Sequence, residues 1–167
     1  MTRLSFRGLS ALGLLACAGG MAFALYLQHV KGFEPCPMCI FQRIAMSGAA
    51  VFFLLGALHG PRAGGRWSYA LLAGLAAVIG AGISGRQVWL QSLPADQVPA
   101  CGPTLGYLMK MMPLQNVVSY VLKGEGSCAK IDAQWLGIAL PEWTLFAFIG
   151  LTLFALAMPL LARRGTN

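Results

Sequence analysis

Charged residues are scarce in this 167-residue chain, at 10% of the composition against about 25% in soluble domains. So few charges cannot cover a water-facing surface, which excludes a soluble globular domain, a disordered chain and a coiled coil. Acidic residues are the rarest, with five Asp and Glu against twelve Lys and Arg. The net charge of +7 would suit a nucleic-acid-binding protein, but a hydrophobic content of 57% decides against that class. The composition therefore indicates an integral membrane protein.

Four apolar segments are long enough to cross a bilayer: residues 8–27, 40–58, 67–85 and 143–162. About 20 residues, each rising 1.5 Å along a helix, cover a hydrocarbon core of roughly 30 Å. Only helices satisfy their own backbone inside such isolated segments. We therefore expect an all-α bundle of four transmembrane helices that forms a single membrane domain over residues 1–167. The first segment is too long for the hydrophobic region of a signal peptide, so we expect it to be retained.

Basic and acidic residues fall on opposite sides of this four-span topology. All five acidic residues lie in the two segments 28–39 and 86–142. The positive-inside rule places both termini and the turn at 59–66 in the cytoplasm, and the two acidic segments outside. This orientation rests on six arginines that flank the spans on the cytoplasmic side: Arg3, Arg7, Arg62, Arg66, Arg163 and Arg164.

The longer outer segment contains one predicted helix. Three prolines, at 94, 99 and 103, argue against regular structure early in it. Pro113 then opens a stretch that Gly124 closes, which is typical of a short helix. Ten residues cannot span a bilayer, so we expect this helix to lie on the membrane surface or to pack on the bundle. Its apolar face comprises Leu114, Val117, Val118, Val121 and Leu122.

Four of the five cysteines lie in the outer segments, Cys36 and Cys39 in the first and Cys101 and Cys128 in the second. Cys17 lies within the first span, where it fits a small apolar filler. Four cysteines allow three pairings, and the segments that they share favour Cys36 with Cys39 and Cys101 with Cys128. A zinc site is less favoured than disulfide pairing, because Cys101 and Cys128 each lack a second Cys or His nearby in the sequence. Two inert structural disulfides are a further alternative.

The environment of Cys39 favours redox chemistry. The closed loop of a C-x-x-C is too short to gain much chain entropy as a staple. Cys36 followed by Pro37 is typical of an N-cap and the first helical position, which places both sulfurs in the first turn of the second span. A helix N-terminus and a neighbouring cation both favour a thiolate. Arg43 lies one turn deeper on the same face, and the alternative is that it only snorkels to lipid headgroups.

These motifs together resemble the DsbB family of disulfide-forming quinone reductases. The resemblance covers residues 10 to about 160, and the joint pattern is far more specific than a C-x-x-C alone. The matching segments are Cys36-Pro-Met-Cys-Ile-Phe-Gln-Arg43, Val88-Trp-Leu-Gln-Ser-Leu-Pro94, Cys101-Gly-Pro, Gly126-Ser-Cys128 and Trp135-Leu-Gly-Ile-Ala-Leu-Pro-Glu-Trp143.

The resemblance implies that the chain is an enzyme with a specific electron path. A reduced, DsbA-like thiol oxidase of the periplasm would attack the Cys101–Cys128 disulfide at Cys101. The freed Cys128 would attack Cys36, and Cys39 would leave as a thiolate that reduces a quinone from the membrane pool. The protein would then be a multi-pass protein of the bacterial inner membrane, with its cysteine segments in the periplasm.

The resemblance also implies a quinone site, for ubiquinone or menaquinone. Arg43 would donate a hydrogen bond to a quinone oxygen, on which charge grows during reduction. Well-studied family members carry His at the position that we align with Gln87, and a Gln can donate a hydrogen bond but cannot titrate near neutral pH. A one-residue shift of the alignment would bring Arg86 there instead. Both residues are therefore candidate quinone contacts.

Two other functions fit parts of the sequence. A quinone reductase like vitamin K epoxide reductase also pairs loop cysteines with a C-x-x-C in a helical bundle, although there the C-x-x-C usually lies late in the chain. A non-enzymatic membrane scaffold would use the same cysteines as two static disulfides. Arg43 beside the C-x-x-C argues against the scaffold, because a charge within a span is costly without a function.

Overall fold

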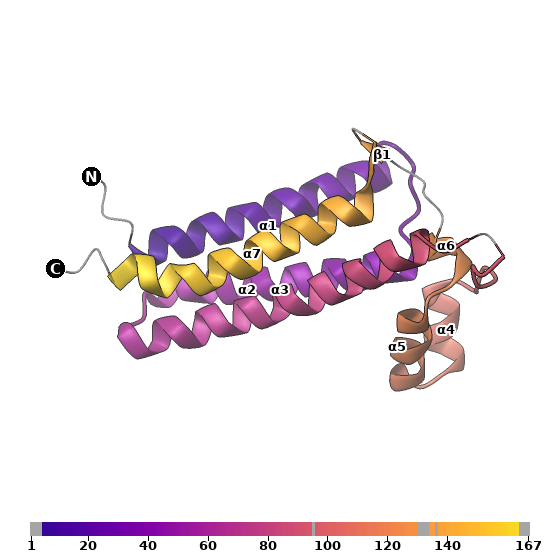
Figure 1. Cartoon of the computed structure of the whole chain (residues 1–167). Coiled ribbons are helices and arrows are strands. Elements are labelled where there is room, and N and C mark those ends of the chain that lie inside the picture. The colour runs from indigo at the N-terminus through magenta and orange to yellow at the C-terminus, as the bar shows by residue number, and fades with distance from the viewer. Residues whose placement is uncertain (1–4, 95, 130–133, 136, 164–167) are drawn as a thin grey trace.

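The computed structural model describes residues 5–94, 96–129, 134–135 and 137–163. Four of its helices are long and apolar enough to cross a membrane: α1 (Phe6–His29), α2 (Pro37–His59), α3 (Ala63–Gln91) and α7 (Leu140–Arg163). They form an elongated bundle in which α1 and α7 lie side by side over α2 and α3 (Figure 1). The predicted all-α, four-span fold is confirmed, and each helix extends beyond its predicted apolar segment.

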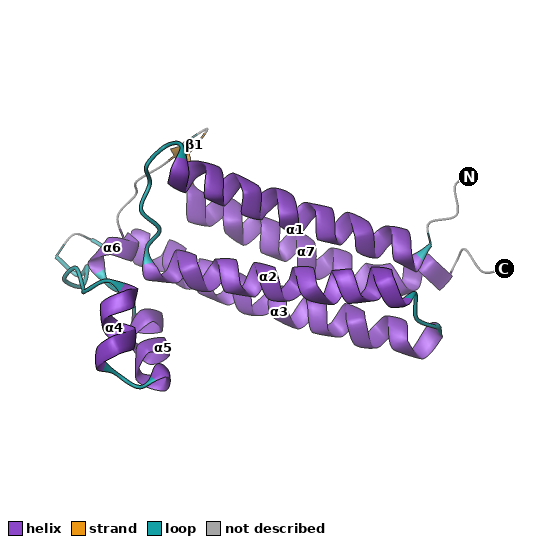
Figure 2. Cartoon of the chain, turned by 180° about the vertical axis from the view of Figure 1, so that it is seen from behind, coloured by secondary structure: helices purple, strands orange, loops and turns teal. Residues whose placement is uncertain are grey.

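The connections divide the bundle into two ends. α1 begins, α2 joins α3 and α7 finishes at one end, whereas the long α3–α7 connection lies at the other (Figure 2). At the first end Gly60 closes α2 with a φ of 54°, and Arg7 donates from Nε to Ala57 O at 2.8 Å. Of the residues behind the predicted orientation, Arg3 and Arg164, and Asp132 on the acidic side, lie outside the described residues, as does the Arg163 side chain. The orientation itself stays a prediction.

The start of α2 follows the local sequence. Cys36 is the N-cap with extended backbone, and Pro37 begins the helix, as predicted. Proline fits there because the first helical N–H has no partner within the helix and the ring already holds a helical φ. The Cys36 sulfur accepts a hydrogen bond from the backbone N–H of Cys39 at 3.3 Å. The cap therefore fixes the two sulfurs on the same helical turn.

The third helix differs from its predicted bounds. The apolar segment ends at Gly85, but α3 continues through Arg86 and Gln87 to Gln91, so these two side chains lie on a helix and not in the outer segment. The extension is stabilised by packing, because its Leu90 side chain is buried in a cluster with side chains of the outer segment. Hydropathy marks where the apolar run ends, whereas an amphipathic helix can continue past it.

Two clusters of buried side chains hold the molecule together. The first fills the bundle, where Ala73 and Ala77 of α3 are fully buried and allow close approach between helices. The second lies at the cysteine end and joins the bundle to the outer segment. Its members are Met38, Ile83, Leu90, Leu108, Val117, Val121 and Cys128.

The outer segment contains more structure than the sequence indicates. Helix α5 (Leu114–Lys123) has the predicted bounds, with Pro113 as its N-cap and Gly124 after it. Val117 and Val121 of its apolar face pack on the bundle, whereas Leu114 and Leu122 are exposed, and its contact with a membrane surface stays a prediction. The elements that were not predicted are α4 (Leu105–Met111), α6 (Gly126–Ala129) and a ribbon of β1 (Gln134–Trp135) with β2 (Ile138–Ala139).

Glycine at position 80 is required by the packing of α3 against α7. A Cβ there would lie 2.3 Å from the ring of Phe148, which is fully buried. We expect Gly80→Ala to lower the free energy of unfolding in detergent micelles by about 1–3 kcal/mol, the usual cost of overpacking. Gly82→Ala is the matched control, since its Cβ meets nothing within 4 Å. Equal stabilities of the two variants, measured by circular dichroism during denaturation, would contradict this packing.

Candidate functional site

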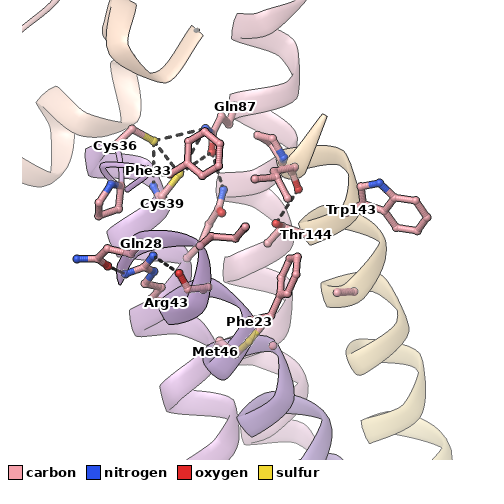
Figure 3. Close-up of a pocket in the computed structure, with 18 of the residues that line it drawn as sticks. Phe23, Gln28, Phe33, Cys36, Cys39, Arg43, Met46, Gln87, Trp143 and Thr144 are labelled. Atoms are coloured by element: carbon pink, nitrogen blue, oxygen red, sulfur yellow. Dashed lines mark hydrogen bonds between the residues drawn. The ribbon is translucent and has the colours of Figure 1, made fainter. Parts of the chain in front are cut away.

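The inner cysteine pair lies at the first turn of α2. Cys36 Sγ donates to Cys39 Sγ at 2.9 Å, and both side chains are half-buried (Figure 3). All five cysteines are free thiols in this structure. Two sulfurs on the same turn and this close need only a small side-chain rotation to form a disulfide. The structure therefore brings Cys36 and Cys39 close enough to form a disulfide.

Cys128 lies beside this pair, although it is far away in the sequence. It is fully buried in the second cluster, on α6, with its side chain beside that of Cys36. The interaction between the two thiols lowers the pKa of Cys128, and the interactions of Cys36 with Cys128 and Cys39 raise the pKa of Cys36. Cys36 thus contacts both possible sulfur partners, Cys39 on one side and Cys128 on the other.

Cys101 lies on the solvent side of the same region. Its side chain is exposed, and it sits against Gly126, where an added Cβ would come within 3.2 Å of its sulfur. The N–H of Gly126 also donates to the carbonyl of Ala100 at 3.2 Å. The segment that carries Cys101 is therefore held against the start of α6, two residues before Cys128. Of the two outer cysteines, one faces water and the other faces the inner pair.

Gln87, a predicted site residue, connects these groups. It projects from α3 and is almost fully buried. Its Nε2 lies 3.4 Å from Cys36 Sγ, 3.6 Å from Cys39 Sγ and 3.5 Å from the carbonyl oxygen of Cys128. Its Oε1 accepts a hydrogen bond from Gln42 Nε2 at 2.8 Å. A single amide therefore contacts both members of the inner pair and the backbone of the outer one.

Arg86, the alternative to Gln87, points elsewhere. Its guanidinium stacks over the ring of Trp89 at 4.1 Å and donates to the carbonyls of Leu122 and Lys123, at 3.2 and 3.0 Å. These carbonyls end α5, where unpaired acceptors favour a cation. Arg86 therefore fastens the end of α5 to α3 and does not line the cavity described below.

Arg43 lies on the α1 side of α2, one turn below Cys39. Its guanidinium donates to the Gln28 side chain and, at 3.1 Å, to the carbonyl of Ala24, both on α1 (Figure 3). These bonds satisfy some of the hydrogen-bond donors of a cation that lies within a membrane span. They also hold the guanidinium at the wall of a cavity and leave it other donors for a ligand.

A cavity of about 270 Å³ opens beside the cysteines, between α1, α2 and α7. Most of its wall is apolar, with Phe23, Phe33 and Met46 among the lining side chains. The polar groups gather on one side, where Cys39, Arg43 and Gln87 lie close together, and Thr144 of α7 lies opposite (Figure 3). An apolar site with a few convergent polar groups is the usual form of a small-molecule site.

Three residues of this region were missed in the sequence. Gln42 is a buried polar residue one turn after Cys39, a signal that could have been noticed within an apolar span. Gln28 shows no pattern that would link it to Arg43. Glu125 is buried with one oxygen bonded to Ser127 and the other without a partner, and nothing in the sequence indicates its burial. Within the described residues no cluster of metal-ligating side chains occurs.

Comparisons with known proteins agree with the resemblance in the sequence. The family model "Disulfide bond formation protein DsbB" matches residues 6–158. Disulfide bond formation protein B of Xanthomonas oryzae pv. oryzae is 50% identical over 165 residues, 98% of this chain and 96% of its own length. The proteins of the same name from Acinetobacter baumannii and Chromohalobacter salexigens are 50% and 51% identical, over 92% and 93% of this chain and 91% of each relative.

The burial of the outer cysteines predicts different reactivities. In the reduced protein in micelles, we expect a charged maleimide to label Cys101 well before Cys128, because one sulfur is exposed and the other is fully buried. Peptide mass spectrometry at successive times measures both rates in one sample. Buried Cys17 is the internal control and should stay unlabelled over the same time. Labelling of Cys128 as fast as Cys101 would contradict the docking of α6.

Proposed function

The chain belongs to the DsbB family, and from this premise we propose that it is a membrane thiol:quinone oxidoreductase. It reoxidises a DsbA-like dithiol of the periplasm and passes the electrons through two cysteine pairs to ubiquinone or menaquinone. The observation that carries the proposal is the position of Cys36, which hydrogen-bonds Cys39 and lies beside Cys128 at the edge of an apolar cavity. Disulfide formation in the membrane follows from the family, and this geometry supports the proposed electron path.

The first exchange takes place at the exposed sulfur. A thiolate of the partner attacks Cys101 Sγ, the Cys101–Cys128 bond breaks, and its electron pair leaves on Cys128. Cys101 suits the attack because it is exposed, whereas Cys128 is buried. The second thiol of the partner then attacks the mixed disulfide, which releases the oxidised partner and a reduced Cys101. Thiolates are the nucleophiles throughout, so each attack requires deprotonation of the attacking sulfur.

The second exchange carries the electron pair into the bundle. The thiolate of Cys128 attacks Cys36 Sγ, the Cys36–Cys39 bond breaks, and Cys39 leaves as a thiolate. Cys36 lies between the two other sulfurs, so the exchange requires little movement of the backbone. The leaving sulfur is at the N-terminus of α2 and lines the cavity, where the helix dipole stabilises its charge. The thiolate of Cys101 then attacks Cys128 Sγ, which re-forms the Cys101–Cys128 disulfide and releases Cys36. One electron pair has then passed from the partner to the Cys36–Cys39 pair.

The residues of the cavity fit a quinone. When bound, a quinone supplies the oxidant that accepts two electrons and two protons from the reduced pair. Arg43 would orient it and stabilise the negative charge that grows on its oxygen, since a fixed cation in an apolar site acts strongly on developing charge. The apolar wall of the cavity excludes water from the Cys39 thiolate. Because the cavity lies among helices that span the membrane, a lipid-soluble ligand can enter from the bilayer.

This function also fixes the proposed location. A periplasmic partner and a membrane-dissolved acceptor require the inner membrane of a bacterium, with α4, α5 and α6 in the periplasm and both termini in the cytoplasm. The arginines at the opposite end of the bundle support that orientation, among them Arg7, Arg62 and Arg66. No nucleic acid takes part in this chemistry.

Replacement of either inner cysteine tests the electron path. We expect Cys36→Ser and Cys39→Ser each to abolish steady-state, quinone-dependent oxidation of a reduced thiol partner, because the relay needs both sulfurs. Loss of partner thiols, followed with a chromogenic thiol reagent, measures the rate. Cys17→Ala is the control and should stay within about twofold of the parent, since this cysteine fills space within the span. Turnover near the parent rate in either serine variant would contradict an electron path through Cys36 and Cys39.

Replacement of Arg43 tests the quinone site. We expect the KM for a soluble quinone analogue to rise in the order Arg, Lys, Met, because Lys keeps the charge but loses the planar fork and Met loses both. A lost hydrogen bond from a charged donor weakens binding by roughly 10- to 150-fold. Single-turnover mixed-disulfide formation at Cys101 is the control and should change little. An unchanged KM in folded Arg43→Met would leave Arg43 with only a structural role between α1 and α2.

A further inference from the structure

The buried side-chain amides of Gln42 and Gln87 meet between α2 and α3, and neither is a member of the proposed electron relay. Gln42 is 6% exposed and Gln87 is 3% exposed, and their side chains hydrogen-bond at 2.8 Å. Burying an amide is costly unless its donors and acceptors are paired. A pair of leucines would fill the same space at lower cost. The pair therefore requires a reason beyond packing.

The hydrogen bonds allow only one orientation of the Gln87 amide. The carbonyl oxygen of Cys128 can only accept, so the Gln87 atom 3.5 Å away from it must be the donor, Nε2. This leaves Oε1 of Gln87 facing Gln42, which must then donate from its own Nε2. Gln42 thus holds the amide with its N–H groups toward the cysteines. Without this bond, the amide could rotate and present its oxygen to the Cys128 carbonyl.

Gln87 joins two parts of the chain that the relay must keep in contact. Its Nε2 reaches the carbonyl of Cys128 on α6 and, at 3.4 Å, the sulfur of Cys36 at the start of α2. From this geometry we propose that Gln42 is a positioning residue, which fixes the Gln87 amide and so holds Cys128 against Cys36. The inference rests on the proposed function, in which the thiolate of Cys128 attacks Cys36.

The ease with which Cys36 and Cys128 form a disulfide measures this positioning directly. The background Cys17→Ala/Cys39→Ser/Cys101→Ser keeps only these two thiols, so the chain can form a single intramolecular disulfide. The protein in micelles is equilibrated with mixtures of reduced and oxidised glutathione, and the fraction oxidised is read by alkylation and mass spectrometry. The equilibrium gives the effective concentration of one thiol at the other, with no quinone and no partner present.

In this background we expect Gln42→Met to lower the effective concentration by about 2- to 12-fold, the usual value of one neutral hydrogen bond. Met keeps the length and volume of the side chain but has no N–H donor. Gln87→Met should lower the effective concentration at least as much. Adding Gln42→Met to Gln87→Met should have no further effect, because Gln42 acts only through Gln87. Ser84→Ala is the control, since this buried serine donates to Gly80 O of its own helix.

The double-mutant cycle separates positioning from packing. If Gln42 only fills space, Gln42→Met should lower the effective concentration by the same factor with Gln87 present and with Gln87→Met. That result would overturn the proposal. An effective concentration unchanged by Gln42→Met would also overturn it. If Gln42→Met does not fold, Gln42→Asn carries the same expectation, because its amide is too short to reach Gln87. A background protein that forms no Cys36–Cys128 disulfide would overturn the relay itself, together with the role of Gln42. If the disulfide forms but its effective concentration does not change in Gln42→Met, only the positioning role is overturned.

Discussion

The close approach of Cys128 to Cys36 is the constraint on which the rest of this structure depends. The two sulfurs come from segments far apart in the chain, so the outer segment must dock on the bundle with little freedom. Arg86 of α3 fastens the end of α5, and Gly124 follows at a point where a Cβ would collide with Leu90. The second cluster then buries Cys128 itself. The chain that leads into α6 is therefore held against α3 before the cysteine is reached.

A second constraint comes from the apolar surroundings. Polar groups at the end of an apolar bundle must find partners within the protein, because the bilayer offers none. Arg43 bonds Ala24 and Gln28 of α1, and Gln42 bonds Gln87 of α3. α2 is thus tied to the helix on each side at the level of its first turns. The same bonds that satisfy these groups also shape the polar side of the cavity.

Sequence patterns of short range predicted much of this molecule. Apolar runs predicted the four spans, and Cys36-Pro37 predicted the start of α2. Both features depend on residues that are adjacent in the sequence. The extension of α3 could not be predicted, since Leu90 is stabilised by residues of the outer segment. The ambiguity between Arg86 and Gln87 has the same origin. Neighbouring residues on a helix point about 100° apart, so only the packing of α3 decides which of the two faces the cysteines.

The different burial of the outer cysteines explains how a small bundle can link water to the membrane. Cys101 is exposed and Cys128 is fully buried, and both belong to the segment that docks on α3. In the proposed relay, a change of bonding partner at Cys128 therefore moves an electron pair from the aqueous surface to the first turn of α2. The protein need not admit its partner into the bundle, and the quinone need not leave the bilayer. In the proposed relay a fixed position for Cys128 makes this separation possible, and the Gln42–Gln87 amide pair beside Cys128 serves that position.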